Sequence, residues 1–338
     1  MNVSRGKVGA AVLTISASIV GYQASAQQRA RLPAECRTPA LMACLQADAR
    51  TRQDCVVSAM TGMPDTCRKQ ISEAGARRSG ALPAGWREDS FGSEALQKVD
   101  WVAPTGKSKA PLLLFVHGGG WSIGDKRTGA GVKAAHFTQG GWAFASANYR
   151  LVPQATVEQQ AADIAAAIAW ARANAAAHGL DPDNIVLMGH SAGAHLVALV
   201  GTDPRYLAAA GVPIAAIKGV ILLDGAGYDI AGQMARPGNA VAGMYDAAFG
   251  KDPARQKALS PTLHASAPNV ARWLILPIER RDDSKAQSEG LAAALRPAGA
   301  SARVVAVPGE SHSSLNKGLG TEGDFATGEV DKFLAGLR

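Results

Sequence analysis

The strongest constraint on the fold of this chain is a series of short apolar runs, each of which ends in a loop rich in glycine, aspartate or histidine. Alanine-rich patterns with helical spacing lie between several of the runs, as in residues 157–179. Strands that alternate with helices form a mostly parallel sheet with helices on both faces, and the ligand site forms where the strands end. The sequence therefore predicts an α/β fold. The runs are PLLLFVHGGGW (111–121), GWAFASANYRL (141–151), DNIVLMGHSAG (183–193), IKGVILLDGAG (217–227), ARWLILPIE (271–279) and ARVVAVPGESH (302–312).

The N-terminus has the pattern of a secretory signal. Arg5 and Lys7 precede the apolar run VGAAVLTISASIVG, and ASA at 24–26 supplies the small residues of a cleavage site. A transmembrane anchor is less favoured, because the run is shorter than the ~20 residues that span a bilayer. We expect a signal peptide at 1–26, a cysteine-rich helical segment at 27–80 and a catalytic domain at 81–338. The signal predicts that the protein is secreted, to the periplasm.

All four cysteines lie in the segment after the predicted signal. They are Cys36, Cys44, Cys55 and Cys67. An even number in an oxidising compartment indicates two disulfides, with three possible connectivities. We favour the nested pairing, 36 with 67 and 44 with 55, which would staple a small helical hairpin. Zinc is disfavoured because the segment has no CxxC pair and no histidine, so no metal is expected. The stapled segment could present a surface to a protein or to the cell wall.

The charge balance is mildly basic. The formal net charge is +7, and it falls to +5 without Arg5 and Lys7, since 1–26 contains no acidic residue. No long run of Lys and Arg is present, so a nucleic-acid partner is not expected. The sequence does not indicate an oligomeric state.

The run ending in GHSAG places a serine at a tight turn between a strand and a helix. Gly189 and Gly193 flank Ser191 at positions where larger side chains would collide with neighbouring backbone. The N-terminus of the following helix favours a developing negative charge. Ser191 is therefore a candidate nucleophile.

A serine nucleophile needs a base and a group that orients the base. His312 follows the last apolar run, and Asp282 and Asp283 follow the run before it, so the order is serine, aspartate, histidine. Asp283 is the preferred acid and Asp282 the alternative. Asp224 also follows an apolar run, but its early position favours a pocket or loop-bracing role.

Besides a nucleophile, a base and an acid, this chemistry needs a site that binds the oxyanion, and HGGGW at 117–121 offers one. Consecutive glycines let backbone N–H groups approach a substrate oxygen closely. We expect the oxyanion hole to consist of the amides of Gly119, Gly120 and Ala192. Gly118 would shape the loop, and His117 would brace it by hydrogen bonding.

HGGGW, GHSAGAHL and the late aspartate and histidine resemble the α/β-hydrolase superfamily. The chain is similar in particular to the branch that contains the carboxylesterases related to hormone-sensitive lipase, with the neighbouring feruloyl esterases and kynurenine-formamidase-like enzymes. The resemblance covers about residues 82–338. The resemblance implies an α/β-hydrolase fold and a serine esterase that needs no cofactor and acts on a small-molecule ester. The preference for Asp283 rests on RDDS, which resembles the formamidase-like branch.

Other functions use or retain the same residues. An arylformamidase or amidase would use the same triad, and a noncatalytic binding protein could retain the fold. A peptidase is less favoured, because no propeller or large cap is evident. A histidine acts as a base only when neutral, so an esterase of this type should lose activity as the pH drops through about 6–7.

Overall fold

The computed structural model describes residues 34–46, 55, 59, 63–64, 66–67, 82–236, 242–266 and 268–337. The predicted signal at 1–26 lies outside these residues, as does most of the segment 27–80. The described strands form one sheet in the order β1-β2-β4-β3-β5-β6-β7-β8. They are β1 (Arg87–Ser90), β2 (Lys98–Val102), β3 (Ala110–Val116), β4 (Ala143–Ala147), β5 (Leu180–His190), β6 (Ile217–Leu223), β7 (Arg272–Leu276) and β8 (Ser301–Val304).

The sheet is antiparallel at one end and parallel through the rest. β2 pairs antiparallel with β1 and β4, whereas β4, β3, β5, β6, β7 and β8 pair in parallel. Every residue of β3 is buried, as a central strand between two helical layers requires. This arrangement confirms the predicted α/β fold with a mostly parallel sheet.

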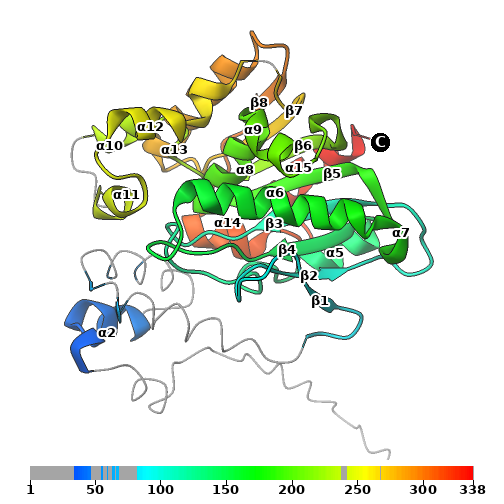
Figure 1. Ribbon diagram of the computed structural model, residues 1–338, viewed down its shortest axis with the longest axis horizontal. Coiled ribbons are helices and arrows are strands. Elements are labelled where there is room, and N and C mark those ends of the chain that lie inside the picture. Colours follow the sequence, from blue (N-terminus) through cyan, green and yellow to red (C-terminus); the bar gives the residue numbers. More distant parts are fainter. Residues whose placement is uncertain are drawn as a thin grey trace, which may run out of the picture.

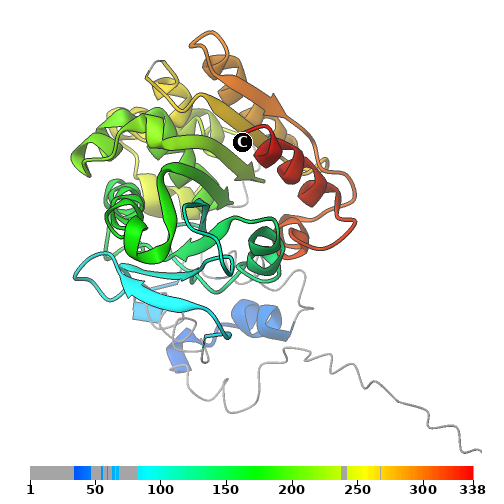
Figure 2. The ribbon, with the colours of Figure 1, turned by 90° about the vertical axis from the view of Figure 1, so that its right-hand side faces the viewer.

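Helices cover both faces (Figure 1), and Figure 2 shows the two layers on opposite sides of the sheet. One layer includes α6 (Val157–Ala173), α8 (Ala192–Thr202) and α13 (Asp282–Leu295), and the other consists of α5 (Lys133–Gln139), α14 (His312–Gly318) and α15 (Phe325–Ala335). The remaining described helices are η1 (Ala34–Cys36), α2 (Pro39–Gln46), α7 (Ala175–His178), α9 (Pro204–Ala209), η2 (Ile214–Ala216), α10 (Ile230–Met234), α11 (Ala242–Phe249), α12 (Pro253–Ala258) and η3 (Pro261–His264). None of the described helices is long and apolar enough to cross a membrane.

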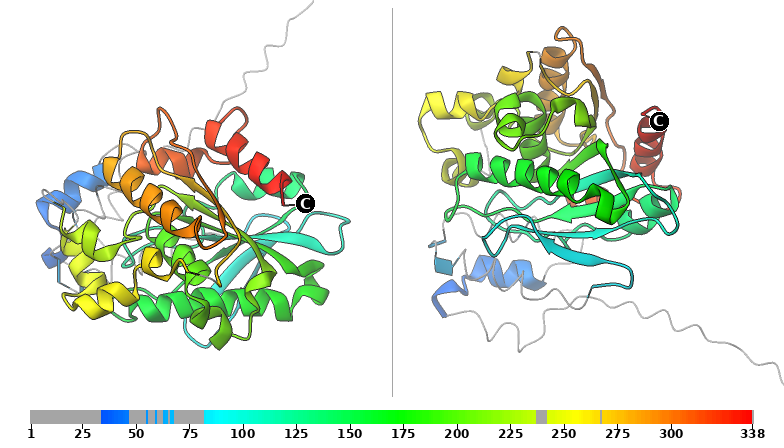
Figure 3. Two further views of the ribbon diagram at one scale, coloured as in Figure 1. Left: turned by 90° about the horizontal axis from the view of Figure 1, so that it is seen from above. Right: turned by 45° about the vertical axis from the view of Figure 1, so that its right-hand side comes forward.

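The alternating side chains of β3 show how one strand serves both layers. Leu112, Leu114 and Val116 belong to the core under α6 and α8, and Leu113 and Phe115 belong to the core under α5, α14 and α15. Successive residues of a strand point to opposite faces. The parallel strands all end at one edge, and α2 and α11 lie at that same end of the molecule (Figures 1 and 3).

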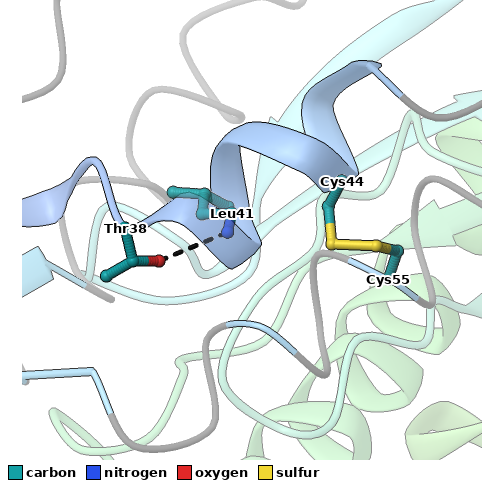
Figure 4. The surroundings of a disulfide bond; sticks show 4 residues. All are labelled: Thr38, Leu41, Cys44 and Cys55. Carbon is teal, nitrogen blue, oxygen red and sulfur yellow. Dashed lines mark hydrogen bonds between the residues drawn. A yellow bond between two sulfur atoms is a disulfide. The ribbon is translucent and has the colours of Figure 1, made fainter.

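The nested disulfide pairing is confirmed. Cys36 is bonded to Cys67 and Cys44 to Cys55. Figure 4 shows the second bond beside α2, where the Leu41 amide donates to Oγ1 of Thr38 at 3.2 Å. Leu41 and Met63 form a buried cluster with the first disulfide, and Ile123, from the loop after β3, packs against this cluster. The stapled segment therefore contacts the loop that carries HGGGW. No group of three potential metal-binding side chains occurs among the residues described.

Candidate active site

Ser191 occupies the tight turn between β5 and α8. Its φ is 56° and its ψ is −120°, a conformation that residues other than glycine rarely adopt. A Cβ on Gly189 would lie 2.3 Å from the carbonyl oxygen of Gly193, and one on Gly193 would lie 2.2 Å from that of Val116. Only glycine fits at both positions. The two glycines thus let α8 begin close against the sheet, with Ser191 at its N-terminus.

The loop after β3 brings its glycines to this turn. A Cβ on Gly118 would lie 2.8 Å from the Cβ of Ser191, so Gly118 packs directly on the predicted nucleophile. Gly119 and Gly120 have positive φ values of 130° and 56°. Ala192 is the first residue of α8, and the first N–H groups of a helix have no acceptor within it. The three residues expected to form the oxyanion hole therefore belong to two segments that meet at Ser191.

His117 braces the glycine loop, as predicted. Its Nδ1 donates to the carbonyl of Gly118 at 2.8 Å. The hydroxyl of Tyr149 donates to the carbonyl of His117 at 3.0 Å, and the two rings stack with centroids 4.4 Å apart. Burial lowers the pKa of His117 and keeps the ring neutral.

His312 is the first residue of α14, which a reciprocal capping interaction holds in place. Oγ of Ser311 accepts from the Ser314 amide at 3.1 Å, and Oγ of Ser314 accepts from the Ser311 amide at 2.8 Å. His190, the residue before Ser191, donates from Nε2 to the carbonyl of His312 at 2.9 Å, and the two imidazole centroids are 4.5 Å apart. Burial, aided by the charge of His312, lowers the pKa of His190 well below its ordinary value. His190 thus connects α14 to the serine turn.

The carboxylate that contacts His312 belongs to Asp224, directly after β6. Its Oδ2 lies 2.6 Å from Nδ1 of His312, and its Oδ1 accepts from the Ile278 amide at 3.1 Å. Its side chain is 0% exposed. Burial alone would raise the pKa of Asp224, but the hydrogen bond and charge of His312, together with the charge of Arg281, hold it well below the ordinary value. The carboxylate is therefore ionised at neutral pH.

Asp283, the acid preferred from the sequence, has a different partner. Nη2 and Nε of Arg281 donate to its two oxygens at 2.8 Å and 3.2 Å, and Nε2 of Gln233 donates to it at 3.2 Å. Asp282 is 86% exposed. Asp283, the predicted acid, thus contacts Arg281 and not His312 in the structure, for a physical reason. Both aspartates begin α13, whereas the guanidinium of Arg281, just before them, lies between Asp283 and His312.

Aromatic side chains pack behind the glycine loop. Nε1 of Trp121 donates to Nδ1 of His195 at 3.2 Å, and Nε2 of His195 donates to the carbonyl of Leu259 at 2.8 Å. The rings of Tyr245 and Phe249 meet Trp121 edge-on, with centroids 5.1 Å and 4.7 Å away. Burial lowers the pKa of His195 to about 4, so this ring is neutral, as its acceptor role requires. His195 is thus a packing and hydrogen-bonding residue.

A buried lysine that the sequence analysis did not single out anchors the far end of α14. Nζ of Lys133 donates to the carbonyls of Asn316 and Gly129 and lies 5.2 Å from the ring centroid of Phe115. Burial lowers the pKa of Lys133 to about 7. Lys133 therefore helps to fix the short helix that begins at His312.

Comparison with known proteins finds esterases among the similar chains. A family model described as BD-FAE matches residues 100–208. The chain is 44% identical over 91 residues to esterase LipQ of Mycobacterium tuberculosis, and the aligned region covers 27% of this chain and 22% of LipQ. It is 29% identical over 243 residues to "Probable isoprenylcysteine alpha-carbonyl methylesterase ICME" of Oryza sativa subsp. japonica, covering 67% of this chain and 57% of that protein. The matched regions thus span less than two thirds of the length of these relatives.

The crystal structure of esterase B from Lactobacillus rhamnosis is similar with a TM-score of 0.64 and 20% identity, over 85% of this chain and 96% of the other. That likeness shows the fold. The chain has the α/β-hydrolase fold. The matched relatives carry the names of esterases and carboxylesterases, and the chain is similar to them over part of its length.

Proposed function

We propose that this chain is a carboxylesterase that cleaves esters through an acyl-enzyme, with Ser191 as nucleophile, His312 as base and Asp224 as the carboxylate that orients the base. The observation that carries the proposal is the 2.6 Å contact between Nδ1 of His312 and Oδ2 of Asp224. A serine is activated by a histidine that a carboxylate orients in this way. His190, the residue before Ser191, donates to the carbonyl of His312 and so connects the histidine to the serine turn. The esterase names of the relatives support the assignment.

The contact with Asp224 defines what His312 can do. Because a carboxylate only accepts hydrogen bonds, Nδ1 of His312 carries the proton and Nε2 is free to accept one from Ser191. The serine oxygen then attacks the ester carbonyl. The resulting imidazolium gives its proton to the leaving alcohol, and water repeats the sequence to release the acid.

The developing oxyanion would be bound by the amides of Gly119, Gly120 and Ala192. The contact of Gly118 with Ser191 brings the glycine loop to the N-terminus of α8, whose dipole favours negative charge there.

The same residues would cleave an N-formyl amide, so a comparison of substrates separates an esterase from an arylformamidase or amidase. The two disulfides support the proposed export to the periplasm, because disulfides persist in oxidising compartments. Detection of the mature chain in a periplasmic extract would test that location.

The function is tested with purified protein, a fluorophosphonate probe, p-nitrophenyl acetate, p-nitrophenyl butyrate and N-formylkynurenine. We expect labelling at Ser191 and faster turnover of the acetate ester than of the formamide. Both labelling and turnover should vanish in Ser191→Ala and persist in Ser301→Ala, which alters an exposed serine on β8. A folded wild-type protein that shows neither labelling nor turnover would contradict the proposal and favour a binding role.

A further inference from the structure

Arg281 connects the two aspartates at this edge of the sheet. It precedes α13, and its guanidinium is about three-quarters buried, with 29% of the side chain exposed. Nη1 donates to Oδ2 of Asp224 at 2.8 Å and to the main-chain carbonyl of Asp224 at 3.2 Å. The other edge of the guanidinium holds Asp283. One rigid, planar group thus fixes both the side chain and the backbone of Asp224.

The position of Arg281 also constrains the imidazole. Nη1 lies 3.0 Å from Nδ1 of His312, and both nitrogens lie within hydrogen-bond distance of the same oxygen of Asp224. An arginine has donors only, so it could bond to Nδ1 only if His312 carried its proton on Nε2. That tautomer cannot accept a proton from serine. The productive arrangement therefore has both nitrogens donating to Oδ2.

We propose that Arg281 is a positioning residue for ester hydrolysis, which holds the Asp224 carboxylate where it orients His312. This inference rests on the proposed function and adds a residue to it. Asp224 has a positive φ of 43°, its Oδ1 accepts from the amide of Ile278 at 3.1 Å, and the side chain of Ser284 also interacts with the carboxylate. Without Arg281, Oδ2 would lose its guanidinium donor, and the side chains of Asp224 and His312 could shift together. A displacement of about 1 Å in a catalytic group costs on the order of a hundredfold in rate.

A buried arginine often serves stability alone, and the chain offers a matched control for that role. Nε of Arg172 donates to the carbonyl of Pro182 at 3.0 Å, and Nη2 donates to Asp183 at 2.8 Å. Its side chain is 23% exposed, close to the value for Arg281. Arg172 lies near the start of β5, at the opposite edge of the sheet from Ser191. Arg172→Gln therefore removes the hydrogen bonds of a similarly exposed arginine far from the site.

The first test compares kcat and KM for p-nitrophenyl acetate in Arg281→Gln, Arg281→Lys and Arg172→Gln. We expect kcat of Arg281→Gln to fall by about tenfold to a hundredfold, with KM changed by less than about twofold, because orientation rather than substrate binding is lost. Lysine keeps the positive charge but lacks the planar, several-donor guanidinium group, so Arg281→Lys should lose less of kcat than Arg281→Gln does. Arg172→Gln should keep the wild-type kcat. Thermal melting establishes that each variant is folded.

The second test places the arginine substitutions in the Asp224→Asn background. If Arg281 acts through Asp224, Arg281→Gln costs little further activity there, so the two effects are strongly non-additive. A purely structural role would cost the same factor in both backgrounds. If Arg281→Gln does not fold, Arg281→Lys carries the same comparison.

The outcomes separate this inference from the function on which it rests. An inactive wild-type protein removes both. An active wild-type protein with unchanged kcat in folded Arg281→Gln overturns the inference alone, as does an equal loss in the wild-type and Asp224→Asn backgrounds.

Discussion

Two neighbouring loops at the carboxyl edge of the sheet each carry an aspartate bound to Arg281, yet only one reaches the imidazole. Asp224, after β6, is fully buried and contacts Nδ1 of His312. Asp283, after β7, is 25% exposed and has Arg281 and Gln233 as partners. The difference shows that the path of the chain beyond each strand decides which carboxylate becomes an orienting group.

The two paths differ in local structure. Asp224 follows β6 immediately and adopts a positive φ, a conformation that aspartate tolerates better than most residues. The chain after β7 continues through the bridge at Ile278 before α13 begins at Asp282. The guanidinium of Arg281 occupies the space beside His312, and Asp283 lies on the side of this guanidinium that faces away from His312.

The largest expected effect separates the two aspartates by activity. Asp224→Asn should lower kcat by about four orders of magnitude, because an amide can accept from His312 less well and can favour the wrong tautomer. Steady-state hydrolysis of p-nitrophenyl acetate measures this loss. Adding Ser191→Ala to Asp224→Asn should cost much less than Ser191→Ala costs in the wild type, since residues that act as a unit are not additive. A loss below about tenfold would remove Asp224 from the proposed triad.

Acid unfolding should separate them next. In the folded protein the pKa of Asp224 is held well below its ordinary value. The pKa of Asp283 is also lowered, but the side chain of Asp283 is less buried than that of Asp224. An unfolded chain then binds protons first as the pH falls below about 4, so the stability contributed by each carboxylate is present above that pH and is lost below it. Urea unfolding between about pH 5 and pH 2.5 should show a flatter pH dependence in Asp224→Asn than in Asp283→Asn. Equal slopes in the two variants would contradict the difference in burial.

A hydrogen bond between the two loops gives a smaller effect. Oγ of Ser284, which is fully buried, donates to the carbonyl of Gly225 at 2.8 Å. Ser284→Ala should lower the free energy of unfolding by about 1–3 kcal/mol, because it leaves a buried carbonyl without its donor. Ser288→Ala is the matched control, since the Oγ of this buried serine has no hydrogen-bond partner in the part of the chain that the structure describes. Denaturant melts of the two variants should differ, and equal melts would show that the bond contributes nothing.

The smallest effect is expected at the aspartate that the sequence favoured. Asp283→Asn removes a partly exposed ion pair, and such pairs contribute little. We expect kcat to stay within about threefold of wild type because the asparagine side chain can still accept from Arg281. The same kinetic assay, run beside Asp282→Asn, measures it. A loss in Asp283→Asn as large as that in Asp224→Asn would reverse the comparison.

The fold and part of the site follow from sequence patterns for clear physical reasons. The apolar runs and the glycines around Ser191 reflect local backbone geometry. The nested pairing of the cysteines that the sequence favours is the one in the structure. The acid does not follow from such a pattern, because a carboxylate is placed by long-range packing. The early position of Asp224 predicts a pocket or loop-bracing role, and no local pattern shows that Asp224 and not Asp283 contacts His312.

Arg281 and Lys133 were missed for a related reason. Both are long cationic side chains, which are usually exposed, and nothing in the neighbouring sequence indicates burial. Their roles become visible only when Asp224, His312 and α14 are brought together by the sheet.

The most direct test of the account is the rate at which a fluorophosphonate labels Ser191 at neutral pH in wild type, Asp224→Asn and Asp283→Asn, with the labelled residue confirmed by mass spectrometry. This rate reports the activation of the serine itself, without the later steps of turnover. We expect labelling to slow by about a thousandfold or more in Asp224→Asn and to stay near the wild-type rate in Asp283→Asn. Slow labelling in Asp283→Asn with a normal rate in Asp224→Asn would contradict it.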